Sequence, residues 1–203
     1  MKNFIIGVSI SVLSSIAIAE GPSWTYASFG FVAGDSSDAF IDGNFSGHSF
    51  NASGELMDNI HARIDYSDVD LNDGISSEGY SIALGAHSAV TDNTDLVVEF
   101  VSANYDFEDG NQTDGYDSYG LNVGLRSMFS NKLELSGGVS FIDLESDADL
   151  GGNNERQVTI YFGGQYIVNE NMGIGIDYSE FNVQITDDFG SISVLNVYAR
   201  WSL

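Results

Sequence analysis

Apolar and polar side chains alternate with a period of two along most of the chain, and this pattern constrains the fold most. The segment from Ile60 to Tyr66 is an example, with two sets of alternating residues: Ile60, Ala62, Ile64 and Tyr66 against His61, Arg63 and Asp65. Successive side chains of a β-strand point to opposite faces, so this period predicts strands with one apolar and one polar face. Beyond residue 19 the sequence has no sustained apolar period of 3.6, and we predict an all-β protein.

Clusters of Asn, Asp, Gly and Ser interrupt the alternation and separate about ten predicted strands. We place these strands at Trp24–Ala33, His48–Met57, Ile60–Val69, Gly79–Val90, Asp95–Tyr105, Ser118–Phe129, Lys132–Leu144, Gln157–Val168, Met172–Phe181 and Ile192–Leu203. Each is long enough to cross a bilayer as a tilted strand of about 9–11 residues. The composition, with 23 glycines, one proline and 12% aromatic residues, suits regular strands joined by tight turns.

The connections between these strands fall into two classes that alternate along the chain. Short turns are predicted at Asp58-Asn59, Thr91–Thr94, Ser130-Asn131 and Asn169–Asn171. Longer acidic loops are predicted at Gly34–Gly47, Asp70–Glu78, Asp106–Asp117, Glu145–Arg156 and Asn182–Ser191. Outer-membrane barrels have short periplasmic turns and longer extracellular loops. We therefore predict an antiparallel up-and-down transmembrane β-barrel of about ten strands, with eight strands as the alternative.

The first residues have the form of a cleaved export signal. A short positive start, Met1-Lys2-Asn3, precedes an apolar stretch, and Ala17-Ile18-Ala19 fits the small-x-small pattern that signal peptidase cleaves. The apolar stretch is shorter than the roughly 20 residues that a spanning helix needs. We predict a signal peptide over residues 1–19 and one barrel domain over residues 20–203.

Charge narrows the classes of partner. The chain has 30 acidic and 6 basic residues, a formal net charge of −24, and phosphates would repel it, so nucleic-acid binding is excluded. With no cysteine, an exported protein of this sequence is held together without disulfides. So strong an acidic bias also fits a soluble protein secreted into salty water, and this alternative stays open at the level of sequence.

The export signal, the alternating strands and the last strand, Leu195–Leu203, resemble those of small bacterial outer-membrane β-barrel proteins of the OmpA membrane-domain and OmpX type, within the porin-like superfamily. The resemblance is one of architecture and covers the whole chain after the signal. It implies a bacterial outer-membrane location, insertion by the barrel-assembly machinery, and contact with outer-membrane lipid and lipopolysaccharide. We expect a monomer. Members of these families commonly end in an aromatic residue, whereas this chain ends in Leu203, with Trp201 nearby.

Charged residues on the polar faces are expected to line the lumen, because a buried charge requires a partner. Counting outward from the short turns places Glu55 beside Arg63, His87 beside Glu99, and Arg126 beside Glu134, with Asp65, Asp177 and Arg200 as further inward candidates. These residues can form either a polar plug or a narrow pore. Small inward residues such as Gly85, Gly124 and Gly138 leave room for the second alternative.

Aromatic residues near the strand ends are expected to form girdles at the two membrane interfaces: Tyr66, Tyr80, Tyr119, Phe129, Tyr178 and Trp201. We expect no enzymatic activity, because the rim residue His48 and its neighbour Ser49 should point to opposite faces of a strand. No cofactor and no metal site are expected, since the acidic segments near Asp70 and Asp106 do not complete a calcium-loop pattern.

Two classes of function are compatible with the sequence. The first is a structural or surface-interaction barrel that acts through acidic extracellular loops. The second is a narrow, cation-preferring, porin-like channel for small solutes.

Overall fold

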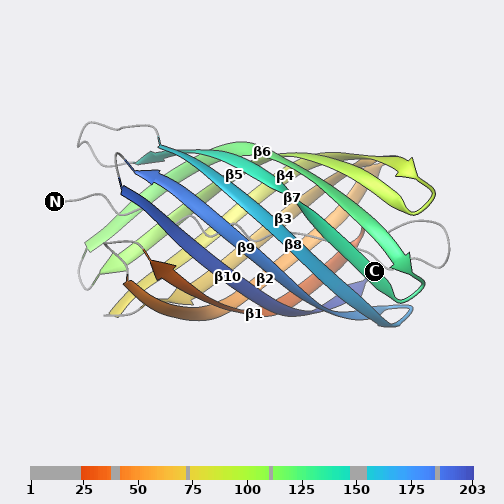
Figure 1. Cartoon of the computed structure of the whole chain (residues 1–203), viewed down its shortest axis with the longest axis horizontal. Coiled ribbons are helices and arrows are strands. Elements are labelled where there is room, and N and C mark those ends of the chain that lie inside the picture. The colour runs from red at the N-terminus through yellow and green to blue at the C-terminus, as the bar shows by residue number, and fades with distance from the viewer. Residues whose placement is uncertain (1–23, 38–41, 72–73, 110–111, 147–154, 186–187) are drawn as a thin grey trace.

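The structure, a computed structural model, describes residues 24–37, 42–71, 74–109, 112–146, 155–185 and 188–203, which form ten antiparallel strands around one barrel (Figure 1). The strands are β1 (Tyr26–Ser37), β2 (Asp42–Met57), β3 (Ile60–Asp70), β4 (Ile75–Thr91), β5 (Thr94–Asp109), β6 (Gln112–Ser130), β7 (Leu133–Ser146), β8 (Glu155–Asn169), β9 (Met172–Ile185) and β10 (Asp188–Ser202). The predicted signal peptide lies outside the described residues. Within them, no helix is both long enough and apolar enough to cross a membrane.

Each strand pairs with its neighbours in sequence, and β1 pairs with β10 to close the barrel. The closing register runs from Tyr26 opposite Ser202 to Ser36 opposite Ile192. Closure leaves no unpaired strand edge, which a barrel in lipid requires because lipid offers backbone groups no hydrogen bonds. The ten-strand, up-and-down prediction is confirmed, and the eight-strand alternative is excluded.

Four two-residue turns join the strands at one end of the barrel, close to the predicted short turns. Their residues favour tight turns: Asn59 has a φ of +66°, and Asn171 N–H donates to the side-chain oxygen of Asn169 at 3.0 Å. Beside each turn the register shifts by one residue, which is a β-bulge. The extra residues are apolar and exposed on the outer face: Leu56, Val90, Phe129 and Val168.

At the opposite end the strands continue into segments that we predicted to be loops. The connection between β1 and β2 spans only residues 38–41, and that between β5 and β6 only residues 110–111. The prediction of long loops at Gly34–Gly47 and Asp106–Asp117 is therefore corrected. Its error was to take polar sequence for loop, whereas a strand that extends beyond the lipid keeps its ladder while its outer face meets water.

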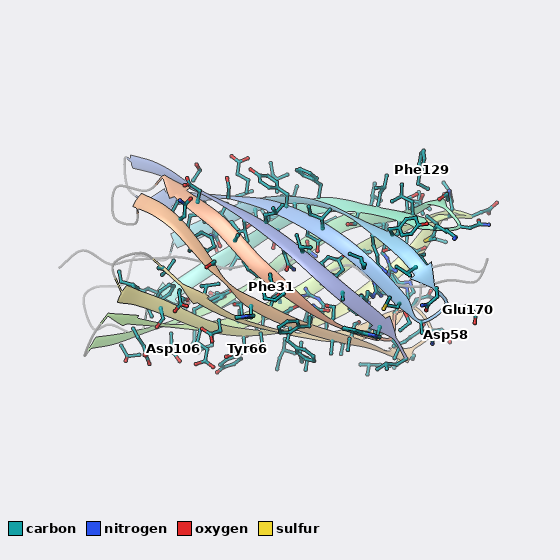
Figure 2. All side chains as sticks on the ribbon, turned by 90° about the horizontal axis from the view of Figure 1, so that it is seen from below. Phe31, Asp58, Tyr66, Asp106, Phe129 and Glu170 are labelled. Carbon is teal, nitrogen blue, oxygen red and sulfur yellow. The ribbon has the colours of Figure 1, made fainter. Side chains whose placement is uncertain are left out.

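The outer face of the barrel is apolar through its middle and acidic at the end opposite the two-residue turns. On β3, Ile64 and Tyr66 face outward, and Asp68 and Asp70 follow them on the same face. Figure 2 shows the same order, with Phe31 on the middle of the wall and Asp106 at the far end from Asp58 and Glu170. A broad exposed apolar belt is incompatible with water, so the soluble alternative is excluded.

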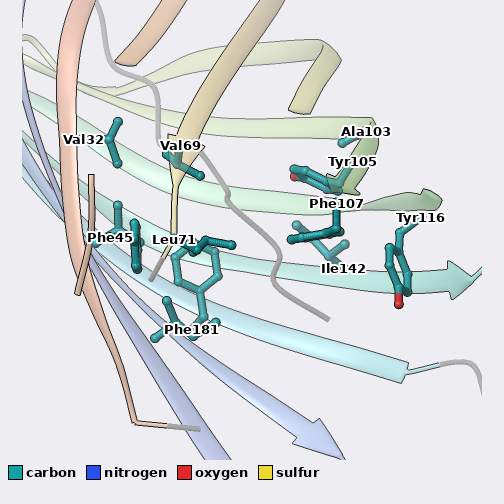
Figure 3. Close-up of a cluster of buried hydrophobic side chains, with 12 residues drawn as sticks. Val32, Phe45, Val69, Leu71, Ala103, Tyr105, Phe107, Tyr116, Ile142 and Phe181 are labelled. Atoms are coloured by element: carbon teal, nitrogen blue, oxygen red, sulfur yellow. The ribbon is translucent and has the colours of Figure 1, made fainter. Parts of the chain in front are cut away.

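The inner face changes from polar to apolar at the level where the outer face changes from apolar to acidic. On β3, the inward side chains of His61, Arg63 and Asp65 give way to Val69, with Leu71 just beyond the strand, and these two belong to a buried apolar cluster (Figure 3). The cluster fills the acidic end of the barrel with Val32, Phe45, Val69, Leu71, Ala103, Tyr105, Phe107, Tyr116, Ile142, Phe181, Ile192 and Val194. This end therefore has the polarity of a water-soluble barrel, and the remainder has that of a membrane barrel.

Candidate functional site

The lumen in the membrane-level part of the barrel holds a network of buried charges, which is the candidate functional site. Most of the predicted lumenal residues are buried there: Arg63, Asp65, Glu99, Arg126, Glu134, Asp177 and Arg200. The other two, Glu55 and His87, lie at the mouth of the lumen near the two-residue turns. Three of the chain's basic residues are thus enclosed by the barrel wall, although its surface is strongly acidic.

Glu99 on β5 is the centre of the network. Its Oε1 accepts from Arg63 Nε at 3.2 Å and lies 2.9 Å from His61 Nε2. Its Oε2 accepts from Arg63 Nη2 at 3.2 Å and from Asn122 Nδ2 at 2.6 Å. Both carboxylate oxygens are therefore satisfied twice, which is what a charge removed from water requires.

These contacts cross β4, which lies between β3 and β5. The inward residue of β4 at this level is Gly85, and a Cβ there would lie 2.6 Å from His61 Nε2 and 2.7 Å from Glu99 Cγ. The absence of a side chain at Gly85 lets residues two strands apart meet. Our prediction paired residues only within single hairpins, so it could not find a contact between β3 and β5. The sequence feature that indicates this contact is the small residue on β4, between the two partners.

Asp65 is the second acidic partner of Arg63. Its Oδ2 receives Arg63 Nη1 and, at 2.7 Å, the hydroxyl of Ser81, and its Oδ1 receives the amide of Asn51. Arg63 thus lies between two carboxylates, Asp65 and Glu99. The cluster joins β2, β3, β4, β5 and β6 across the lumen.

Arg126 and Glu134 form a second ion pair nearer the turns. Arg126 Nε donates to Glu134 Oε1 at 2.6 Å, and its Nη2 donates to Oε2 at 3.2 Å, a two-point contact between neighbouring strands. The guanidinium also lies 4.4 Å from the centre of the Trp24 ring. Trp24 is buried at 4% exposure and stacks on His87 at 4.0 Å and on His61 at 4.5 Å.

Trp24 was predicted only as the first residue of a strand, and its position inside the lumen was missed. It precedes β1 and packs into the mouth of the barrel among cationic and imidazole side chains. A tryptophan is the aromatic residue that binds cations best through its ring face. The available sequence signal is its odd spacing from the outward residues Phe29 and Phe31, which places it on the inner face.

Arg200 on β10 and Asp177 on β9 are both buried, as inward residues should be. Arg200 Nη1 donates to Gln165 Oε1 at 3.0 Å across β9, where the intervening residue is Gly173. Its guanidinium also lies 3.6 Å from the centre of the Tyr26 ring. A buried arginine is therefore held by an amide and an aromatic face.

In two of the predicted cross-strand pairs, the residues are not partners in the observed strand register. Glu55 lies opposite His61 rather than Arg63, and His87 lies opposite Val97 rather than Glu99. The bulge beside each two-residue turn shifts the register, so counting outward from the turn fails. Arg126 and Glu134 are in contact, but on a diagonal, since Arg126 lies directly opposite Ser136.

The small inward residues do not leave open space. A Cβ added at Gly124 or Gly138 would collide with the Tyr161 hydroxyl, and one at Gly175 or Gly30 would collide with Tyr198 or with residues beside it. Large rings from other strands thus occupy the room that these glycines provide. The lumen is packed by its own side chains at this level.

The predicted girdle residues lie at two levels on the outer face. Tyr66 and Tyr80 are cross-strand partners just below the acidic end, and Tyr119 donates its hydroxyl to Glu145 Oε1 at 3.1 Å. Phe129 belongs to the turn end, as Figure 2 shows, and Trp201 lies one strand-residue from the end of β10. Tyr178 is half-buried and donates to Ser193 Oγ at 3.2 Å.

Among the described side chains, the structure does not bring His48 and Ser49 together. His48 is exposed on the outer face beside Phe29 and Phe31, whereas Ser49 is buried on the inner face. Among the described residues, no group of three or more His, Cys, Asp or Glu side chains is arranged to hold a metal ion. Parts of the acidic segments considered for calcium lie outside the described residues.

No known protein family's sequence profile matches this chain, and no curated protein is similar to it. Solved structures are similar in fold. The outer-membrane protease OmpT of Escherichia coli aligns over 88% of this chain and 96% of its own, with a TM-score of 0.54 and 9% identity. The translocator domain of the autotransporter NalP of Neisseria meningitidis covers 88% of each chain, with a TM-score of 0.47 and 9% identity. Neisserial surface protein A covers 89% and 98%, with a TM-score of 0.35 and 14% identity.

At such identities the likeness to OmpT concerns the fold alone. That fold is the bacterial outer-membrane β-barrel, and it agrees with the closed sheet and the apolar belt described above. The chain is thus an outer-membrane β-barrel, located in the bacterial outer membrane. The narrower resemblance to the OmpA and OmpX types stays a prediction.

Proposed function

We propose that this outer-membrane barrel is non-conducting and has a structural or surface-interaction role through an acidic extracellular surface. The observation that carries the proposal is the filled lumen. Buried charged side chains occupy one level of the lumen and the apolar cluster occupies the next, so two kinds of packing follow one another along the axis. Small barrels of this type are usually filled by side chains.

The surface in question is an acidic collar on the outer face beyond the apolar belt. It consists of exposed residues on the ends of the strands: Asp35, Asp68, Asp70, Glu78, Asp106, Glu108, Asp117, Glu145 and Glu180. Arg156 is the one basic side chain described beside this surface, and it pairs with Asp143 at 3.0 Å. The acidic end is extracellular if the short turns are periplasmic, as in other barrels of this class.

The collar follows directly on Tyr66 and Tyr80, and interfacial tyrosines commonly lie at the level of lipid headgroups, which supports a position of the collar beside them. Carboxylates there would repel lipopolysaccharide phosphates unless divalent cations lie between them, since Mg²⁺ and Ca²⁺ bind carboxylate and phosphate oxygens together. We infer that outer-membrane lipid and lipopolysaccharide are the partners of the collar, through shared divalent cations. This contact would stabilise the barrel in its membrane.

The first test is single-channel conductance of the folded, purified protein in a planar bilayer. Silence from protein whose circular dichroism shows a folded barrel supports the proposal, and reproducible current steps contradict it. The collar is tested by the affinity for lipopolysaccharide vesicles with Mg²⁺ and with a chelator. The variant D68N/D70N/E78Q should lose the Mg²⁺-dependent part of binding, whereas the turn-end control D58N/E170Q should keep it.

A narrow, cation-preferring channel is the second candidate, and one observation favours it. Gln157, Thr159 and Asn122 are buried in the lumen, and each has a polar side-chain atom without a hydrogen-bond partner in the protein. Such atoms are commonly satisfied by internal water. If current steps are seen, replacement of Arg126 or Glu134 should change their size or ion selectivity. We propose that the protein has no enzymatic activity.

A further inference from the structure

A cavity of about 580 Å³ lies at the turn end of the barrel, outside the charge network. Its wall includes Trp24 and residues in and beside the first two turns, among them Glu55, His87, Ala89, Asp92 and Asp95. Its volume is in the range of small-molecule sites, which is about 300–1,000 Å³. We propose that this cavity binds an alkylammonium group, meaning a primary amine on a short aliphatic chain.

The charge of the wall selects a cation. Glu55, Asp92 and Asp95 carry carboxylates, and among the described residues no lysine or arginine lines the cavity. Arg126 is not part of the wall; it contacts the Trp24 ring and is paired with Glu134. The described wall therefore presents three carboxylates to a ligand, which favours a cation over a neutral or anionic group.

His87 supplies the second, independent observation. Its side chain is only 9% exposed, it lines the cavity, and its Nε2 has no hydrogen-bond partner in the protein. Nε2 lies 4.0 Å from Glu55 Oε1, and Nδ1 lies 3.8 Å from Asp95 Oδ2, so both carboxylates are too distant for direct hydrogen bonds to the ring. A buried polar atom without a partner is costly and commonly marks a ligand site.

An ammonium group fits these acceptors better than other cations. It has three N–H donors, and the cavity offers a ring nitrogen and carboxylates at spacings that a donor between them could bridge. A transition metal does not fit, because the described residues contain no arrangement of three ligating side chains. Ala89 and Trp24 give an apolar part of the wall for the aliphatic part of the ligand.

Trp24 makes the wall rigid. His87 stacks on it at 4.0 Å, and Arg126 lies 4.4 Å from its centre. Its indole is therefore held in place before the ligand arrives, which reduces the ordering cost of binding. The same contact makes Trp24 a reporter, because a ligand beside His87 changes the surroundings of the indole.

Both a free diamine and a lysine side chain of a periplasmic polypeptide carry this chemistry. The experiment uses the full chain with Trp201→Phe, folded in detergent micelles, so that Trp24 is the one tryptophan left. Its fluorescence is titrated with 1,5-diaminopentane, with a lysine-containing tripeptide, and with 1,5-pentanediol as the uncharged probe of equal length. Saturable change with either amine and none with the diol supports the proposal, and the stronger amine identifies the source.

Variants locate the site. Asp95→Asn and Glu55→Gln should each weaken amine binding by about tenfold or more, because each removes a charged hydrogen-bond acceptor. Asp106→Asn, at the opposite end, should leave binding unchanged. A heat-dependent gel shift verifies that each variant is folded. Equal response to amine and diol, no saturation, or equal weakening by Asp106→Asn would each overturn the proposal, whatever the conductance measurements show.

Discussion

Removing both members of the Arg126–Glu134 pair should destabilise the barrel less than removing either one. Glu134→Met leaves the fully buried Arg126 without its carboxylate, and the loss of one partner of a buried pair costs about 3–5 kcal/mol. Arg126→Met strands Glu134 at a similar cost and also removes the contact with Trp24, worth about 2 kcal/mol when desolvated. The double variant R126M/E134M strands no charge, so we expect a cost of only about 2 kcal/mol.

The free energy of unfolding is measured by urea titration of the barrel in lipid vesicles. Far-ultraviolet circular dichroism is the better signal, because Arg126 lies beside Trp24 and its replacement would alter tryptophan fluorescence directly. All four proteins of the cycle are compared in the same lipid and at the same ionic strength.

The exposed pair Arg156–Asp143 provides the matched cycle. Its atoms are 3.0 Å apart, but the Arg156 side chain is 68% exposed, so water screens the interaction. We expect an interaction energy below about 1 kcal/mol there. If R126M/E134M costs as much as the two single variants together, the two residues act independently and our account of the network is wrong.

Three further outcomes are expected from the same unfolding assay. Gly138→Val should destabilise the barrel strongly, because its Cβ would collide with a backbone oxygen and a tyrosine hydroxyl. Gly54→Ala should be tolerated, because no atom lies within 4 Å of the added Cβ. Equal effects of the two substitutions would contradict a packed lumen. Leu84→Arg on the lipid-facing wall should cost about 2–4 kcal/mol, and Asn104→Arg near the acidic collar about 0–1 kcal/mol; the reverse order would refute the depth that we assign to the membrane. Phe181→Ala should cost about 3–5 kcal/mol, since this ring is fully buried in the apolar cluster, and a cost near zero would show that the cluster is not packed in the membrane-bound protein.

The number and order of the strands were predictable, because period-two alternation and turn residues are local signals. The ends of the strands were not predictable, because our prediction assumed that one face stays apolar along a whole strand. On β5 the outward residues pass from Phe100 to Asp106, while the inward residues pass from Glu99 to Tyr105 and Phe107. The alternation continues, but the outward residues become polar and the inward residues become apolar. In the sequence, this exchange looks like the end of a strand.

The lumenal residues could be predicted as a set, but their partners could not. Alternation alone places Arg63 and Glu99 on the inner face, but their contact depends on the glycine between them and on the tilt of the strands. The bulge beside each turn further shifts the hairpin register. Its spacing from Phe29 and Phe31 could have placed Trp24 on the inner face, but its contacts could not be predicted, because they come from β3, β4 and β6.

The pairing of β1 with β10 has a consequence for the rate of assembly. Tyr26 and Ser202 are partners across almost the whole chain, whereas every other strand pair is formed within one hairpin. A hairpin closes over a short stretch of chain, whereas the seam needs both β1 and β10, and contacts of such sequence separation form slowly. Until then the edges of β1 and β10 are open to strands of other chains. Substitutions along this seam should therefore slow the appearance of folded barrel more than equally destabilising substitutions within a hairpin.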